Sequence, residues 1–268
     1  EHAGTIKKID GTYNTDSNAA NLKLAIPGNI LAAGTNNTDV SDQVTNSSSS
    51  EKSISITSSP AVTDSGKYYG KSIKFDGSDD MVVVSDHADW TFGDSDFCIE
   101  GWFYVDSGSS ASNTNSWAPL IFRGTSSDNN IYDWRLYWGT TSGYRQVYFD
   151  CTFGGSQKYL GDVVENVHDF EFDTWNHVAA TRHGSTVRLY VNGKFIDKET
   201  SISGDMDDDY NDLIMGKEKI ANLQRYFMGQ LSDIRIYKGT SKYGDTDNDF
   251  VIPQRTDFTV NNLTGDND

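Results

Sequence analysis

Proline and cysteine are both scarce in this chain of 268 residues, which contains 4 prolines and 2 cysteines. Two cysteines, Cys98 and Cys151, are too few for a disulfide framework. They could form one disulfide if their strands are neighbours, and we favour the alternative that both are buried free thiols. A chain of this length can bury enough apolar surface to fold without a disulfide or a metal. No stretch approaches the roughly 18 consecutive apolar residues of a membrane-spanning helix, so membrane insertion is not expected.

Basic residues are also few, with 22 Lys and Arg against 39 Asp and Glu, which gives a formal net charge of −17. Such a negative field repels a phosphate backbone and anionic lipid surfaces. Nucleic acid is therefore excluded as an expected partner. The acidity is compatible with a strongly solvated surface or with cation binding.

The residues that are plentiful are aromatic and turn-forming ones. Trp, Tyr and Phe make up 12% of the chain, and Ser, Thr, Asn, Asp and Gly separate short alternating runs. The sharpest signal is Thr186–Val191, then Asn192-Gly193, then Lys194–Asp197, which predicts a hairpin with a type I′ turn. About a dozen strands at such spacings predict an all-β sandwich or barrel. The expected strands are 22–26, 54–56, 72–75, 81–84, 96–105, 120–123, 134–138, 146–153, 175–182, 186–191, 194–197, 213–216 and 227–237.

The two ends of the chain differ from its middle in polarity and in the regularity of their apolar residues. Residues 1–20 are polar and aperiodic and are expected to form an N-terminal arm, while 241–268 are expected to form a C-terminal tail that is disordered or straps the protein to an assembly. Residues 21–240 form the predicted domain. Its expected core residues are Phe75, Val82, Val84, Phe97, Ile99, Phe103, Val178, Leu189, Val191 and Ile236.

Five segments of this domain, in order, resemble the laminin-G-like family of concanavalin A-like lectin domains. They are KSIKFDG at 71–77, DFCIEGWF at 96–103, WNHVA at 175–179, RLYVNG at 188–193 and GQLSDIRIY at 229–237. The resemblance implies an antiparallel β-sandwich of the jelly-roll type. One departure is Ser232, which stands where the family has the first Asp of a closing pair.

The end of the domain has a narrower resemblance. YKGTSKY at 237–243, followed by DFVIP at 249–253, is similar to laminin-G-like domains of bacteriophage structural proteins, many of them from marine phages. This implies a non-enzymatic module of a capsid decoration or tail fibre, located on a virion surface or outside cells. Its partners would be other assembly subunits, with homo-oligomers possible and a glycan as a possible ligand. The alternative is a secreted, calcium-dependent lectin-like module.

Catalytic signals are weak, so the chain is not expected to be an enzyme. The resembling hydrolases carry Glu-x-Asp-x-x-Glu on one strand, whereas Glu100 is the only glutamate of its strand. The sequence GGSQK at 154–158 lacks the second glycine of a nucleophile elbow. A glycoside hydrolase remains a minor alternative.

Calcium is the one cofactor that the resemblance suggests. Laminin-G-like relatives often bind calcium through an early acidic turn and the closing strand. The corresponding residues here are Asp39, Ser41, Asp42 and Asp233. Loop aspartates also cap turns through their own backbone, and both interpretations stay open.

A glycan would be bound by exposed aromatic rings beside polar groups. The candidate ligand-binding residues cluster in one strand-turn-strand unit and the loops near it. They are Trp117, Tyr132, Trp134, Trp138 and Tyr144. The alternative is that these rings fill the core, because every second residue of a half-buried strand must face inward.

Overall fold

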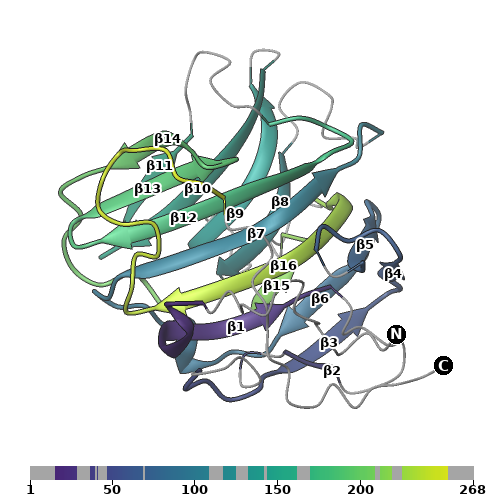
Figure 1. The fold of residues 1–268 in the computed structure, drawn as a ribbon, viewed down its shortest axis with the longest axis horizontal. Coiled ribbons are helices and arrows are strands. Elements are labelled where there is room, and N and C mark those ends of the chain that lie inside the picture. Colours follow the sequence, from purple (N-terminus) through teal and green to yellow (C-terminus); the bar gives the residue numbers. More distant parts are fainter. Residues whose placement is uncertain are drawn as a thin grey trace, which may run out of the picture.

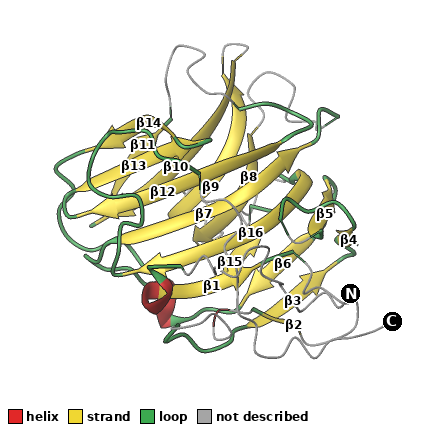
Figure 2. Ribbon diagram, viewed as in Figure 1, coloured by secondary structure: helices red, strands yellow, loops and turns green. Residues whose placement is uncertain are grey.

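The structure is a computed structural model that describes residues 16–28, 37–39, 41, 47–68, 70–108, 117–124, 132–141, 144–161, 170–208, 212–218 and 225–252. Within these ranges the elements are strands and short 3-10 helices, and the strands form two antiparallel sheets packed face to face (Figures 1 and 2). The predicted all-β sandwich is confirmed. No helix in these ranges is long and apolar enough to cross a membrane.

Sheet A, the front sheet in Figure 1, has the order β14-β13-β12-β7-β16-β5-β4, and β1 also pairs with β16. Its strands are β1 (Leu22–Ile26), β4 (Ala61–Thr63), β5 (Ser72–Asp76), β7 (Phe97–Val105), β12 (Trp175–His183), β13 (Thr186–Val191), β14 (Lys194–Glu199) and β16 (Met228–Lys238). All five family-like segments therefore lie side by side, in the order β13, β12, β7, β16 and β5.

Sheet B, behind it, has the order β11-β10-β9-β8-β15-β6-β3-β2. Its strands are β2 (Asn37–Thr38), β3 (Ser53–Thr57), β6 (Met81–Val84), β8 (Trp117–Gly124), β9 (Tyr132–Thr141), β10 (Tyr144–Phe153), β11 (Ser156–Leu160) and β15 (Leu213–Met215). Two 3-10 turns, η1 (Ala19–Asn21) and η3 (Ala88–Trp90), complete the described elements.

The core lies between the two sheets, and all ten predicted core residues are buried in it. Strand β7 shows why alternation predicted them. Phe97, Ile99 and Phe103 point into the core, while Glu100 and Trp102 lie on the opposite face, where they contact His177. Cys98 and Cys151 are buried and unpaired, which confirms the interpretation as free thiols.

The predicted hairpin joins β13 and β14 as the sequence indicated. Asn192 and Gly193 have φ values of 51° and 79°, the left-handed pair that a type I′ turn requires. A Cβ on Gly193 would lie 2.3 Å from the carbonyl oxygen of Phe250, so the turn also needs glycine because another segment crosses it closely.

That crossing segment is 239–252, which we call the strap. Figure 1 shows it leaving β16 and passing over β12 and β13 on the outer face of sheet A. Phe250 N donates to Gly193 O at 2.7 Å, and the Tyr243 and Phe250 rings stack with centroids 3.7 Å apart. Most of the strap falls in the predicted C-terminal tail, and these residues pack on the chain's own sandwich.

The strap buries a charged network on sheet A. The Glu100 carboxylate accepts hydrogen bonds from Lys242 Nζ and Tyr243 Oη, and His177 Nε2 lies 3.3 Å from it. Burial alone would raise the pKa of Glu100, but Lys242 and His177 outweigh burial and lower it. Glu100 is therefore a buried, ionised anchor for the strap.

Candidate functional site

The outer face of sheet B carries a row of aromatic and charged side chains across β8, β9, β10 and β11. Alternation explains the row, because Trp134, Leu136 and Trp138 of β9 point into the core, which leaves Arg135 and Tyr137 on the other face. In the register of the sheet, Tyr137 pairs with Tyr148, and Arg135 pairs with Asp150. We call this surface the sheet B face.

Three rings form a stack at one end of the sheet B face. The Tyr137 and Tyr148 rings are nearly parallel, with centroids 5.0 Å apart and an interplanar angle of 8°. Trp117 lies over both of them, with 5.0 Å between ring centroids in each case. The two tyrosines are buried and Trp117 is half-buried, so Trp117 is the ring that the stack presents to solvent.

A polar cluster lies beside the stack. Arg135 Nη2 is 2.8 Å from Asp150 Oδ2, and Arg135 Nη1 is 2.6 Å from Glu218 Oε1. The other Glu218 oxygen is 2.9 Å from Arg225 Nη1. The Arg135 guanidinium also lies over the Tyr137 ring, 4.7 Å from its centroid. Two cations and two anions thus balance one another.

Asp150 is the most enclosed member of this cluster. Its side chain is fully buried, and no described residue donates a hydrogen bond to its Oδ1 atom. Burial raises the pKa of Asp150, and the ion pair with Arg135 offsets this only in part. Burial and the nearby Asp150 carboxylate together raise the pKa of Tyr132 and of Tyr137. These phenols therefore stay protonated and able to donate hydrogen bonds.

The structure divides the five predicted ligand-binding residues between two faces. Trp117 and Tyr132 lie on the sheet B face, where Tyr132 Oη donates to Asp150 Oδ2 at 3.3 Å. Trp134 and Trp138 are fully buried core residues, because strand alternation turns them inward. The side chain of Tyr144 lies outside the described residues.

Sequence reasoning missed Tyr148, Arg135 and Asp150. Alternation was the available signal, since a β9 strand with Trp134 and Trp138 inward must place Arg135 and Tyr137 outward. Glu218 and Arg225 had no such signal, because only the tertiary fold brings them beside β9.

The predicted calcium ligands are engaged by donors within the protein. Asp39 is buried and accepts hydrogen bonds from the amides of Ala25, Ser41 and Lys52, at 3.1, 3.2 and 2.7 Å. Asp233 forms a two-pronged pair with Arg235, at 2.9 and 3.0 Å. Asp42 lies outside the described residues. A cation would have to compete with these donors, and calcium at these residues stays a prediction.

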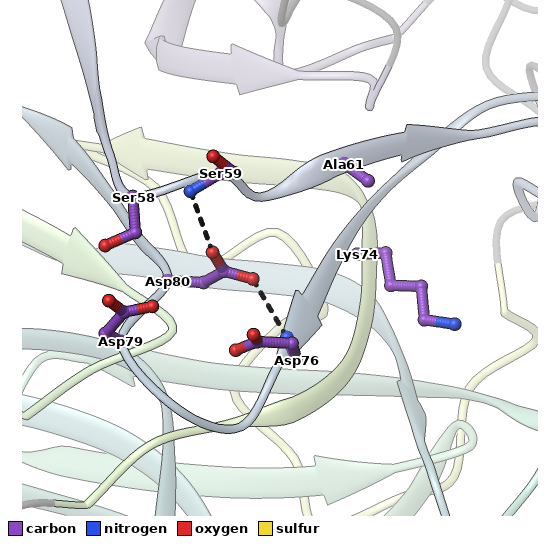
Figure 3. A pocket seen from close by; sticks show the side chains of 7 residues that line it. All are labelled: Ser58, Ser59, Ala61, Lys74, Asp76, Asp79 and Asp80. Atoms are coloured by element: carbon purple, nitrogen blue, oxygen red, sulfur yellow. Dashed lines mark hydrogen bonds between the residues drawn. The ribbon is translucent and has the colours of Figure 1, made fainter.

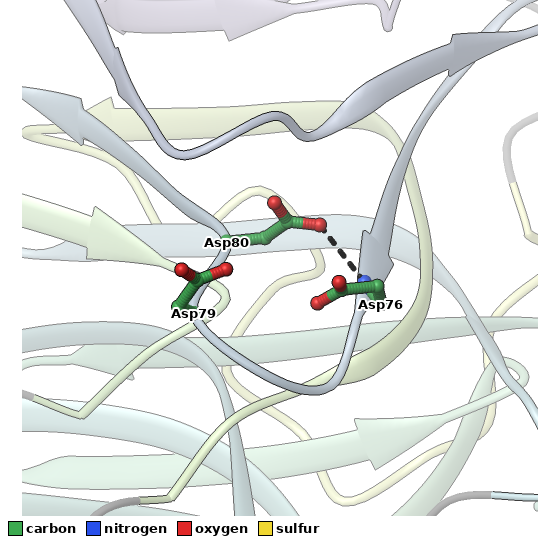
Figure 4. Close-up of side chains that lie close together, drawn as sticks. All are labelled: Asp76, Asp79 and Asp80. Atoms are coloured by element: carbon green, nitrogen blue, oxygen red, sulfur yellow. Dashed lines mark hydrogen bonds between the residues drawn. The ribbon is translucent and has the colours of Figure 1, made fainter.

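A small acidic pocket of about 480 Å³ lies at the turn between β5 and β6 (Figure 3). Asp76, Asp79 and Asp80 each offer a carboxylate oxygen there, and these oxygens lie within 4.8 Å of one another (Figure 4). Asp80 accepts from the amides of Ser59 and Asp76, at 3.0 and 2.9 Å. These contacts close the turn, and they give this acidic group a structural role.

Comparison with known proteins places the fold. Residues 76–242 match the family model described as the concanavalin A-like lectin/glucanases superfamily. The chain belongs to this family. No curated protein matches its sequence.

Solved structures resemble the chain in fold. The binding domain of Paraclostridial Mosquitocidal Protein 1 is 16% identical, with a TM-score of 0.60, over 84% of this chain and 50% of that one. The receptor-binding domain of botulinum neurotoxin D is also 16% identical, with a TM-score of 0.56, over 84% of this chain and 51% of that one. This chain thus spans about half the length of these toxin domains.

Domain 4 of AbnA, an extracellular arabinanase of Geobacillus stearothermophilus, was solved in complex with arabinotriose. It is 14% identical, with a TM-score of 0.53, over 82% of this chain and 93% of that one. Identities this low establish the shared fold alone. The family member described here therefore has a lectin-like, carbohydrate-binding type of fold, and its ligand must be argued from its own residues.

Proposed function

We propose that this protein is a non-enzymatic carbohydrate-binding module that recognises glycans through the sheet B face. The observation that carries the proposal is the Trp117 ring, held over Tyr137 and Tyr148 and set beside the Arg135–Asp150 cluster. Sugars bind to surfaces of this kind because their C–H faces pack on aromatic rings while hydroxyls pair with fixed polar groups. The fold shared with the arabinanase domain supports the same interpretation.

The polar cluster supports binding rather than hydrolysis. A glycosidase needs one carboxylic acid to donate a proton and a second carboxylate to act as base or nucleophile. Asp150 and Glu218 are instead both held by the Arg135 guanidinium. These ion pairs fix the two carboxylates in place, which suits hydrogen bonding to a ligand.

The test is a glycan array followed by calorimetry on the best ligand. Trp117→Ala should weaken glycan binding about five- to thirtyfold, because stacking on an aromatic ring contributes on the order of 1–2 kcal/mol. Trp175→Ala is the matched control, since Trp175 is a half-buried tryptophan of sheet A that packs edge-on against Tyr104. An array without hits, or equal losses in both variants, would refute the proposal, and turnover of a bound glycan would refute its non-enzymatic part.

The second part of the proposal concerns location. The ending 237–253 resembles that of bacteriophage structural proteins, which supports display on a virion or another extracellular surface among other subunits. The strap residues pack on sheet A, so attachment would have to use other parts of the chain. Deleting residues 1–15 or 253–268 tests this. At least one deletion should abolish attachment to the virion or surface that carries the protein, without changing the unfolding curve. If both shortened proteins attach normally, this part of the proposal is wrong.

A further inference from the structure

The charges described on the sheet B face balance one another, and this property bears on which glycans it accepts. Among the described residues, its charged side chains are Arg135 and Arg225 on one side and Asp150 and Glu218 on the other, and each is within 2.9 Å of an opposite charge. An anionic group on a ligand would have to compete with a carboxylate for a guanidinium that the carboxylate already binds. Because both carboxylates are buried, losing their cation would leave an uncompensated charge, which is costly.

One buried polar atom of the described cluster has no partner there, and it is an acceptor. Oδ1 of Asp150 is buried and has no hydrogen-bond donor among the described residues. A sugar hydroxyl can donate to such an atom, whereas a sulfate, sialate or uronate carboxylate only accepts and would be repelled by it. The net charge of −17 on the chain adds a long-range repulsion of anions.

Tyr159 is the neighbour of Asp150 on the edge strand. It pairs with Asp150 from the edge strand β11, and its side chain is 53% exposed. Its phenol is close enough to Tyr132 of β9 to contribute to the raised pKa of that residue. Because β10 lies between β9 and β11, a Tyr159 side chain that reaches Tyr132 must cross the strand that carries Asp150. An exposed side chain of an edge strand can rotate away, and this would open Oδ1 to a ligand.

We infer that the sheet B face selects uncharged sugar residues over sialylated, sulfated or uronic ones, with a sugar hydroxyl donating to Asp150 Oδ1. This inference rests on the proposed function, since it names the ligand class of the same site. Two-residue steps along a strand measure about 6.6 Å, so the Arg135–Asp150 row lies about one such step from the Tyr137–Tyr148 pair. A short oligosaccharide spans that distance, with one residue on Trp117 and the next at Asp150.

The test compares matched glycans on the full chain. Each neutral oligosaccharide that binds is measured beside its sulfated and sialylated derivatives by calorimetry, at two salt concentrations. The neutral member of each pair should bind at least about tenfold more tightly, which corresponds to about 1.4 kcal/mol. If anionic members bind as well or better, the inference is overturned while the proposed function stands. If no glycan binds at all, the proposed function itself fails.

Two variants locate the selectivity. Asp150→Asn removes the acceptor charge and leaves one excess cation, so the preference for neutral glycans should fall at least about fivefold. Asp64→Asn is the control of equal charge change, since that side chain is 90% exposed on another part of the chain. Arg225→Gln is the second variant, and it should fold because Arg225 is partly exposed. It removes a cation, so it should strengthen the preference for neutral over anionic glycans. Unchanged selectivity in both site variants would overturn the role of this cluster.

Discussion

Lys242→Met should destabilise the protein strongly, because it removes the cation that neutralises Glu100 beneath the strap. Glu100 is fully enclosed, and its carboxylate accepts from Lys242 and Tyr243. Removing one partner of a buried ion pair typically costs about 3–5 kcal/mol, since the other charge stays buried. For a chain of this size that corresponds to a fall of roughly 6–20 °C in Tm.

The assay is urea unfolding followed by tryptophan fluorescence, with calorimetry for Tm. The double variant Glu100→Gln with Lys242→Met should recover most of the lost free energy, because replacing a whole buried pair with uncharged groups is often close to neutral. Lys198→Met is the control. Lys198 pairs with Asp247, and both side chains are more than a third exposed, so its loss should cost less than about 1 kcal/mol.

Two results would refute this reasoning. One is a Lys242→Met variant as stable as the Lys198→Met control, which would mean that the strap does not depend on the Glu100 charge. The other is a double variant whose loss of unfolding free energy equals the sum of the losses in Glu100→Gln and in Lys242→Met. That result would mean that the two residues act independently.

Further predictions concern pH, the strap and the acidic turn. The pKa of Glu100 in the folded chain lies below its ordinary 4.5, so its contribution to the free energy of unfolding is complete above about pH 5 and decreases on acidification. Glu100→Gln should therefore flatten the dependence of urea-derived stability on pH below about pH 5. Gly193→Ala should cost about 2 kcal/mol or more and expose the strap to proteases, because its Cβ would lie 2.3 Å from Phe250 O at a φ of 79°. Asp80→Ala should lower the free energy of unfolding by about 1–3 kcal/mol, because it leaves two amides unpaired. Asp79 is exposed, so Asp79→Ala should lower it by less than about 0.5 kcal/mol. Calcium should leave Tm unchanged if the Asp80 cluster only closes its turn, and a rise in Tm that Asp79→Ala abolishes would show a cation site there.

Alternation of apolar residues was enough to predict most strands, because it depends on near neighbours in the chain. Phe97, Ile99 and Phe103 had to share a face in any extended conformation, and that face had to be the buried one. The Asn192-Gly193 turn was equally local, since it needs two left-handed residues at a fixed spacing. The family resemblance supplied the sandwich, which these local patterns alone left open between sandwich and barrel.

The candidate site was predicted only in part. Clustering in the sequence brought Trp134 and Trp138 into the same group as Trp117, although alternation within β9 sends both into the core. The cluster of Arg135, Asp150, Glu218 and Arg225 combines residues from segments up to 90 positions apart, and no local pattern predicts which segments meet.

The sequence by itself therefore determined the strands, the hairpin and the inward-facing residues, because each depends on interactions between near neighbours. The tertiary structure decided which strands share a sheet, which rings reach solvent and how the charges pair. It also decided that the strap folds back over Glu100, because a buried carboxylate requires a cation and Lys242 reaches it only after the sheet has formed. These are long-range choices, and they place the proposed glycan surface on sheet B.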